Sequence, residues 1–184
     1  CEAAWQAANL GIDVELYEMK PKKYSPAHKN SNFAELVCSN SLRADGIYNA
    51  VGLLKEEMRV FGSVCLSAAA ECSVAAGGAL AVDRDIFSKL VTEKIKSHSN
   101  IEIENRIVTK VPQDGITIIA TGPLTDGDLA EDISALCDGE NLSFYDAAAP
   151  IVTAESIDMT KAFYASRYGK GTDDYINCYM NKGE

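Results

Sequence analysis

Residues 2–19 read EAAWQAANLGIDVELYEM, a helix pattern followed by a strand pattern. Trp5 and Leu10 lie among alanines in the first half, and Gly11 ends the helix pattern. The second half alternates apolar and polar side chains as far as Glu18. A helix, a glycine and a strand that ends in an acid form the second half of a βαβ unit that binds dinucleotides, where the acid accepts hydrogen bonds from a ribose. The sequence therefore predicts an α/β fold, in which Glu18 is either a ribose ligand or an ordinary acid at a strand end.

Helical spacing of apolar residues recurs in three later segments. Residues 48–62 carry an apolar stripe that we expect to be core. Asp85 is expected to cap a helix that runs to about residue 97, and residues 126–140 are helical in part. The apolar positions of the three stripes are Val51, Leu54, Met58, Phe61, Ile86, Leu90, Val91, Ile95, Leu129, Ile133 and Leu136. Residues 64–74 are rich in Ala, Ser and Cys, and they fit either a strand or a buried connector.

Strand patterns follow in the middle of the chain. Residues 101–111 alternate in a way that suits one or two strands, and GITIIA at residues 115–120 is apolar throughout, as in a buried strand. This run leads into Thr121 and Gly122, which form either a turn without ligand or a strand end that contacts a cofactor. Gly77 and Gly78 precede another short apolar run, where adjacent glycines suit a simple turn or a close backbone approach to a planar ligand.

Composition limits the class of protein. The chain has 184 residues, 47% of them hydrophobic, and contains no run of the ~20 apolar residues that a membrane helix needs. A net charge of −10 argues against a surface that coats itself with DNA or other nucleic acid nonspecifically. The six cysteines form no CxxC pair and have no histidine partner at zinc spacing, which predicts no metal site and free thiols in a reducing cytoplasm.

Two segments carry local positive charge. The loop MKPKKYSPAHK contains Lys20 and three further lysines without an acid, so it either meets a phosphate or is a solvated loop. Residues 156–184 mix aromatic and basic side chains, which either stack on and pair with RNA or form half of a core. These side chains are Phe163, Tyr164, Tyr168, Tyr175, Tyr179, Lys161, Arg167, Lys170 and Lys182.

Residues 33–43 read FAELVCSNSLR and place Cys38 between an apolar run and small hydrogen-bonding side chains. Ser39, Asn40 and Ser41 offer donors and acceptors in a loop that can present the thiol to a ligand. Lone cysteines of this kind are usually inert and buried, so residue chemistry leaves both roles open.

A set of longer strings resembles a known family. FAELVCSNSLR, NAVGLLKEEMR, ECSVAAGGALAVDR, TIIATGPLT, FYDAAAPIV and SIDM occur here in this order. In their order and spacing they resemble the folate- and FAD-dependent tRNA (uracil-5-)-methyltransferases, and the likeness covers residues 1 to about 180. The resemblance implies a Rossmann-like, glutathione-reductase-like FAD-binding domain with a smaller inserted domain. It also implies 5,10-methylenetetrahydrofolate as one-carbon donor, NAD(P)H as the usual reductant and a T-loop uridine of tRNA as acceptor.

The resemblance also assigns roles to particular residues. Cys38 matches the cysteine of the family's ELVCSNS motif and is the expected catalytic residue. Glu18 matches the family's ribose acid, and Thr121 with Gly122 matches its Ala-Thr-Gly turn beside the FAD. The remaining expected cofactor contacts are Lys20, Ser39, Asn40, Ser41, Gly77 and Gly78.

The chain departs from the family at both ends. The family's first strand and glycine loop would precede Cys1, and its later catalytic cysteine, in a Gly-Cys-Met-Pro segment, lies beyond the last residue. Ala75 and Tyr179 stand where the family commonly has proline, and Cys178 matches a different family cysteine. We therefore expect a fragment, incomplete at both ends and inactive by itself, with a partial FAD-binding domain over residues 1–145 and the start of a second domain over 146–184.

Two other functions remain open at this stage. One is the related flavoprotein that modifies the wobble uridine of tRNA, and the other is a noncatalytic nucleotide-binding fragment. The ELVCSNS motif favours the methyltransferase.

Overall fold

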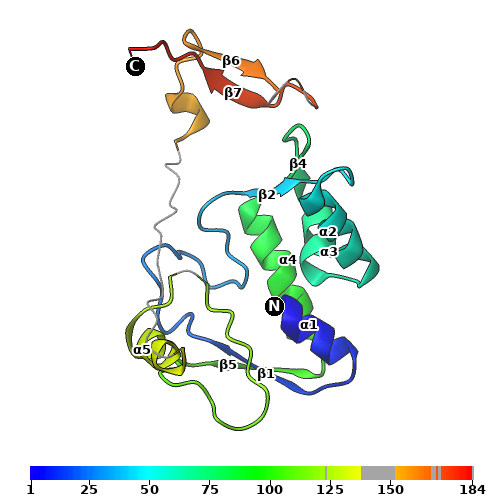
Figure 1. Cartoon of the computed structure of the whole chain (residues 1–184), viewed down its shortest axis with the longest axis vertical. Helices are drawn as coiled ribbons and strands as arrows, with labels where there is room; N and C mark the ends of the chain where they lie inside the picture. The colour runs from blue at the N-terminus through cyan, green and yellow to red at the C-terminus, as the bar shows by residue number, and fades with distance from the viewer. Residues whose placement is uncertain (123, 138–151, 167–168, 170, 184) are drawn as a thin grey trace.

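The computed structural model describes residues 1–122, 124–137, 152–166, 169 and 171–183. Its first unit is a parallel pair of strands, β1 (Val14–Glu18) and β5 (Ile101–Asn105), in which Val14 lies opposite Ile101 and Glu18 opposite Asn105. Helix α1 (Glu2–Asn9) precedes β1, and the turn at Gly11 adopts a φ of 81°, which suits a glycine. The helix, turn and strand predicted from residues 2–19 are confirmed, and so is the α/β class (Figure 1).

The second unit is an antiparallel sheet with strand order β2-β4-β3, covered by helices. Its strands are β2 (Ser41–Ala44), β3 (Ser73–Val74) and β4 (Ala79–Val82), and its helices are α2 (Ala50–Val60), α3 (Val64–Glu71) and α4 (Arg84–Ser97). Helix α4 contacts both α3 and β5, so it joins the two sheets (Figure 1). The buried core therefore runs from α1 through α3 and α4 to β4, and its fully buried side chains include Ile95, Val64, Val82 and Val91.

The remaining elements lie toward the C-terminus. Helix α5 (Gly127–Leu136) confirms the helix expected in this region, and none of its residues is fully buried. A short 3-10 helix, η1 (Ala154–Ser156), precedes an antiparallel hairpin of β6 (Ala162–Ala165) and β7 (Tyr175–Cys178). The expected boundary at residue 145 falls outside the described residues, so the two-domain division stays a prediction. Among the described residues, every helix is too short or too polar to span a bilayer.

Some expectations from local sequence patterns about helix position, helix capping and buried residues were wrong. Of residues 64–74, expected as a strand or a buried connector, Val64–Glu71 form α3 and only Ser73–Val74 form a strand, and Ala68 and Ala69 of α3 are fully buried. Asp83 caps α4 by accepting hydrogen bonds from the N–H groups of Asp85 and Ile86, so Asp85 lies in the first turn and is not the cap. The expected core positions Leu54 on α2 and Phe61 directly after it are exposed, and on α4 Ile86 is exposed whereas Phe87 is buried.

The strand expected at residues 115–120 is absent from the described structure. This segment has no strand partner there, and the side chains of Ile116, Ile118 and Ile119 are 99%, 67% and 43% exposed. A strand needs the N–H and C=O groups of a neighbour, and apolar composition alone does not supply them.

The N-terminus of α3 is held by a carboxylate from another helix. Glu2 on α1 accepts hydrogen bonds from the Ser63 hydroxyl at 2.7 Å, the Cys65 N–H at 3.1 Å and the Gln6 amide at 2.9 Å. Burial alone raises the pKa of Glu2, but these hydrogen bonds together outweigh it and hold the pKa below its ordinary value. Burial raises the pKa of the neighbouring Cys65 thiol to about 12, with the Glu2 charge adding to the effect.

Glu2→Ala is expected to lower the free energy of unfolding by about 1–3 kcal/mol, because it removes an anion from a helix N-terminus and leaves donors unpaired. Since folding lowers the pKa of Glu2, its contribution is complete above the unfolded pKa and is lost as pH falls through the folded pKa. Urea unfolding at pH 7 and at about pH 3 should therefore show a smaller difference between variant and parent at the lower pH. Glu57→Ala, at an exposed position of α2, is the matched control, and an equal loss in both variants would contradict this role.

Candidate functional site

Glu18 lies where the sequence predicted, at the C-terminal end of β1, the edge at which parallel sheets bind ligands. The half-buried carboxylate accepts a hydrogen bond from the Lys20 N–H through Oε1 at 2.9 Å. A carboxylate offers about four acceptor positions, so this contact leaves capacity for a ribose hydroxyl. The Asn105 amide at the end of β5 donates to the carbonyl of Lys20, which joins the two strand ends.

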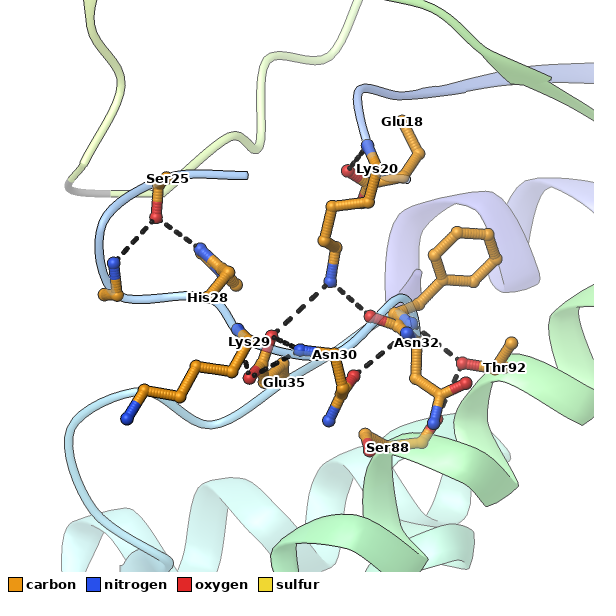
Figure 2. A network of polar contacts seen from close by, with 12 residues as sticks. Glu18, Lys20, Ser25, His28, Lys29, Asn30, Asn32, Glu35, Ser88 and Thr92 are labelled. Atoms are coloured by element: carbon orange, nitrogen blue, oxygen red, sulfur yellow. Dashed lines mark hydrogen bonds and ion pairs between the residues drawn. The ribbon is translucent and has the colours of Figure 1, made fainter. Parts of the chain in front are cut away.

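The side chain of Lys20 points toward residues 29–35, in the loop that follows it (Figure 2). Its side chain is 4% exposed, and its ammonium donates to the carbonyl of Asn32 and lies 3.8 Å from the carboxylate of Glu35. Glu35 also accepts from the N–H groups of Lys29 and Asn30. The charge of Lys20 is therefore used to shape this loop, and its expected phosphate contact stays a prediction.

The same loop is pinned to α4. The N–H of Phe33 donates to the Thr92 hydroxyl at 2.8 Å, and that hydroxyl donates to the carbonyl of Ser88 at 2.7 Å (Figure 2). The Phe33 ring is 4% exposed and belongs to the core. Because α4 also contacts β5, the loop is held by a helix that packs against the parallel pair.

Cys38 is exposed and lies at an open hollow of about 650 Å³. The hollow is lined by Cys38, Ser39, Asn40, Val74, Val82, Asp83, Arg84 and Asp85. The Arg84 guanidinium donates to the carbonyl of Cys38 at 3.2 Å, so the start of α4 holds the cysteine loop. Of the two roles that the residues left open, the structure therefore shows the exposed thiol at a loop, as the resemblance implies, and its expected place beside the flavin stays a prediction.

The polar residues after Cys38 fix the backbone. The N–H of Ser41 donates to the Ser39 hydroxyl at 3.1 Å, while Asn40 exchanges hydrogen bonds with Val82 through its backbone carbonyl at 3.0 Å and its side-chain amide at 3.1 Å. Ser41 itself lies in β2, beyond the loop in which we expected it. Arg43 has a φ of 70° within the irregular pairing of β2 with β4, a strained conformation for a residue with a side chain.

The two predicted glycine sites differ in their surroundings. Gly77 has a φ of 58° in the turn before β4, and its N–H donates to the Asp174 carboxylate at 2.7 Å. Gly122 has a φ of 83°, and its carbonyl accepts from the Thr125 hydroxyl, which is 2.6 Å from that of Thr121. Cofactor contact by Gly77, Gly78, Thr121 and Gly122 stays a prediction.

The structure thus groups the predicted residues in two places. Cys38, Ser39 and Asn40 line one hollow, whereas Glu18 and Lys20 meet at the end of β1. Sequence reasoning gave no role to Asp83 and Arg84, although both lie in one of the quoted motifs. Asp83 stands directly before a helix, and that position is the signal for a cap that we missed.

The fold and site define a class of protein. A parallel pair of strands with a carboxylate at the end of one strand and helices packed beside it is an α/β arrangement of the kind that binds nucleotides. The chain belongs to the family described as glucose inhibited division protein A, whose model matches residues 1–184.

Its relatives carry a more specific name. Proteins named methylenetetrahydrofolate–tRNA-(uracil-5-)-methyltransferase TrmFO are 62% identical in Acetivibrio thermocellus over 184 residues, 58% in Lactobacillus gasseri and 58% in Desulforamulus reducens. Each match covers 100% of this chain and 42% of the relative. The chain therefore spans less than half the length of these curated relatives.

Proposed function

We propose that the full-length protein methylates C5 of a uridine in the T loop of tRNA. The one-carbon unit comes from 5,10-methylenetetrahydrofolate, with FAD as cofactor and NAD(P)H as reductant. The name that the relatives carry, at 58–62% identity over the whole chain, supports the donor, the acceptor and the reaction. The structural observation that carries the proposal is the exposed Cys38 at a hollow whose backbone is held on both sides.

The reaction explains why a thiol is needed there. C5 of uracil is a poor nucleophile until another group adds at C6, and a thiolate is the usual group. Cys38 either makes that addition or assists the flavin while a second cysteine adds. In both cases the Arg84 contact and the Asn40–Val82 hydrogen bonds orient the loop that carries the sulfur.

The residues at the end of β1 fit the adenosine half of FAD. Glu18 provides an acceptor for ribose hydroxyls at the edge where parallel sheets bind nucleotides. When bound, the flavin supplies the electrons that convert a methylene into a methyl group. The further proposed contacts are Ser39, Asn40, Ser41, Gly77, Gly78, Thr121 and Gly122, and Lys20 supports this end through the loop that it holds.

Glu18→Ala in the full-length protein is expected to weaken FAD retention about tenfold or more, because one charge-assisted contact to the ribose is lost. The flavin absorbance per polypeptide after purification and the Kd for added FAD measure it. Glu15→Ala, three residues earlier on the same strand, is the control. Equal flavin content in both variants would contradict the assignment of Glu18 as a ribose ligand.

The activity itself is tested with a T-loop tRNA transcript, FAD, NADPH and methylenetetrahydrofolate labelled in its one-carbon unit. Label in 5-methyluridine, and none with a transcript that lacks the T-loop uridine, is the expected result. Label at the wobble position instead would support the related flavoprotein that modifies that base. We further propose that the protein works in the cytoplasm, on tRNA and not on DNA.

A further inference from the structure

The β6–β7 hairpin contacts the turn that precedes β4, although the paired residues are 97 and 99 positions apart in the chain (Figure 1). The Asp174 carboxylate accepts from the N–H of Gly77 at 2.7 Å, and the Tyr175 hydroxyl donates to the carbonyl of Ala76 at 2.9 Å. Thr172 donates to the same carboxylate. The hydrogen bonds from Thr172 and Gly77 lower the pKa of Asp174, and the one from Thr172 has the larger effect.

The approach is close enough to require glycine in the hairpin. A Cβ at Gly171 would lie 2.8 Å from the nitrogen of Gly78 and 2.9 Å from the carbonyl carbon of Gly77. These are backbone atoms, so the overlap cannot be relieved by rotating a side chain. Gly171 also has a φ of 79°, which disfavours any other residue.

The turn at Ala76, Gly77 and Gly78 is also linked, through β2 and β4, to the loop that carries Cys38. The carbonyl of Gly78 accepts from the N–H of Asp45 at 3.1 Å, directly after β2. Strand β4, which begins at Ala79, pairs with β2 and ends at Val82, the residue that Asn40 holds. Val82 and Asn40 both line the Cys38 hollow.

We propose that Asp174 and Tyr175 are positioning residues, which clamp the hairpin to the Ala76, Gly77 and Gly78 turn and thereby set the shape of the Cys38 hollow. They act through β4, and neither is assigned contact with a substrate. The inference rests on the proposed function only in taking Cys38 as the working thiol.

The first measurement is hydrogen exchange in the full-length protein, followed by mass spectrometry on the peptide that contains Gly77. Asp174→Ala is expected to raise the exchange rate of that peptide about tenfold, and Tyr175→Phe by a smaller factor. Asp174→Asn keeps an oxygen acceptor for the Gly77 N–H and should restore most of the protection. Asp173→Ala is the control, because Asp173 accepts from the N–H of Ser166 within the hairpin region.

The second measurement is the alkylation rate of Cys38 by iodoacetamide, divided by that of Cys137, an exposed cysteine at the end of α5. The clamp predicts that this ratio rises at least threefold in Asp174→Ala and stays unchanged in Asp173→Ala. Neither measurement needs activity, so each outcome is independent of whether the methylation assay succeeds. An unchanged exchange rate at Gly77 in Asp174→Ala would show that Asp174 does not hold the turn. A raised exchange rate with an unchanged ratio of alkylation rates would show that the clamp does not affect Cys38. Either result overturns the proposal.

Discussion

Cys38→Ala in the full-length protein should reduce folate-dependent tRNA methylation by roughly 10³-fold or more, the scale seen when a reacting nucleophile is removed. Cys38 is exposed at its hollow, and the loop around it is held by Arg84 and by the hydrogen bonds between Asn40 and Val82. The variant loses the sulfur and retains these contacts. The rate is measured as 5-methyluridine formed per folded molecule in a single turnover.

The same variant should keep its stability within about 0.5 kcal/mol, because an exposed atom in a loop buries little surface. Cys137→Ala removes another exposed thiol, at the end of α5, and should leave both rate and stability near those of the parent. A purely structural Cys38 would show the reverse pattern, with methylation retained per folded molecule and a lower Tm. Measuring rate and Tm on the same preparation therefore separates the two roles.

Gly52→Ala should cost about 3 kcal/mol or more in the free energy of unfolding, near the upper limit for an overpacked position. In an open helix, alanine is favoured over glycine by roughly 1 kcal/mol, so local propensity predicts the opposite sign. Here a Cβ at Gly52 would lie 2.0 Å from the carbonyl oxygen of Gly46 and 2.9 Å from the carbonyl carbon of Asp45. These are backbone atoms, so α2 or the preceding turn must move.

Gly46→Ala is the matched control at the other side of this contact. Its Cβ would have the Asn49 amide nitrogen at 3.7 Å as its nearest neighbour, an ordinary van der Waals distance. Urea unfolding of both variants should give a large loss for Gly52→Ala and a small change for Gly46→Ala. Comparable losses would mean that backbone flexibility in this turn, and not the overlap, controls stability. Movement of the turn should also disturb the ion pair of Asp45 with Arg59, which is 2.6 Å long.

Much of the first unit could be predicted because its signals are local. The apolar spacing of α1, the glycine at position 11 and the alternation up to Glu18 all lie within eighteen consecutive residues. The Cys38 loop is similar, since Ser39 and Ser41 bond to backbone groups two residues away. Short-range periodicity therefore placed the end of β1, and turn chemistry indicated the loop that carries Cys38, although it left the exposure of the thiol open.

Helix faces were harder to predict from the same kind of pattern. Leu54 and Phe61 have helical spacing, but Gly52 and Lys55 are the buried residues of α2. Lys55 is buried because its ammonium donates to the carbonyls of Ala44 and Val51, and burial lowers its pKa. Which face of a helix is covered depends on the neighbours that pack against it, and these neighbours are remote in sequence.

The α/β class and the position of Glu18 at a strand end could be read from the residues, whereas the role of Cys38 was implied only by the family resemblance. Tertiary structure alone decided that Lys20 turns inward to Asn32 and Glu35, and that Asp174 reaches Gly77 across ninety-seven positions. The physical reason is that periodicity and capping act within a few residues, whereas a buried charge or an occupied backbone N–H depends on which partner folding brings near. No pattern within one segment of the chain carries that information.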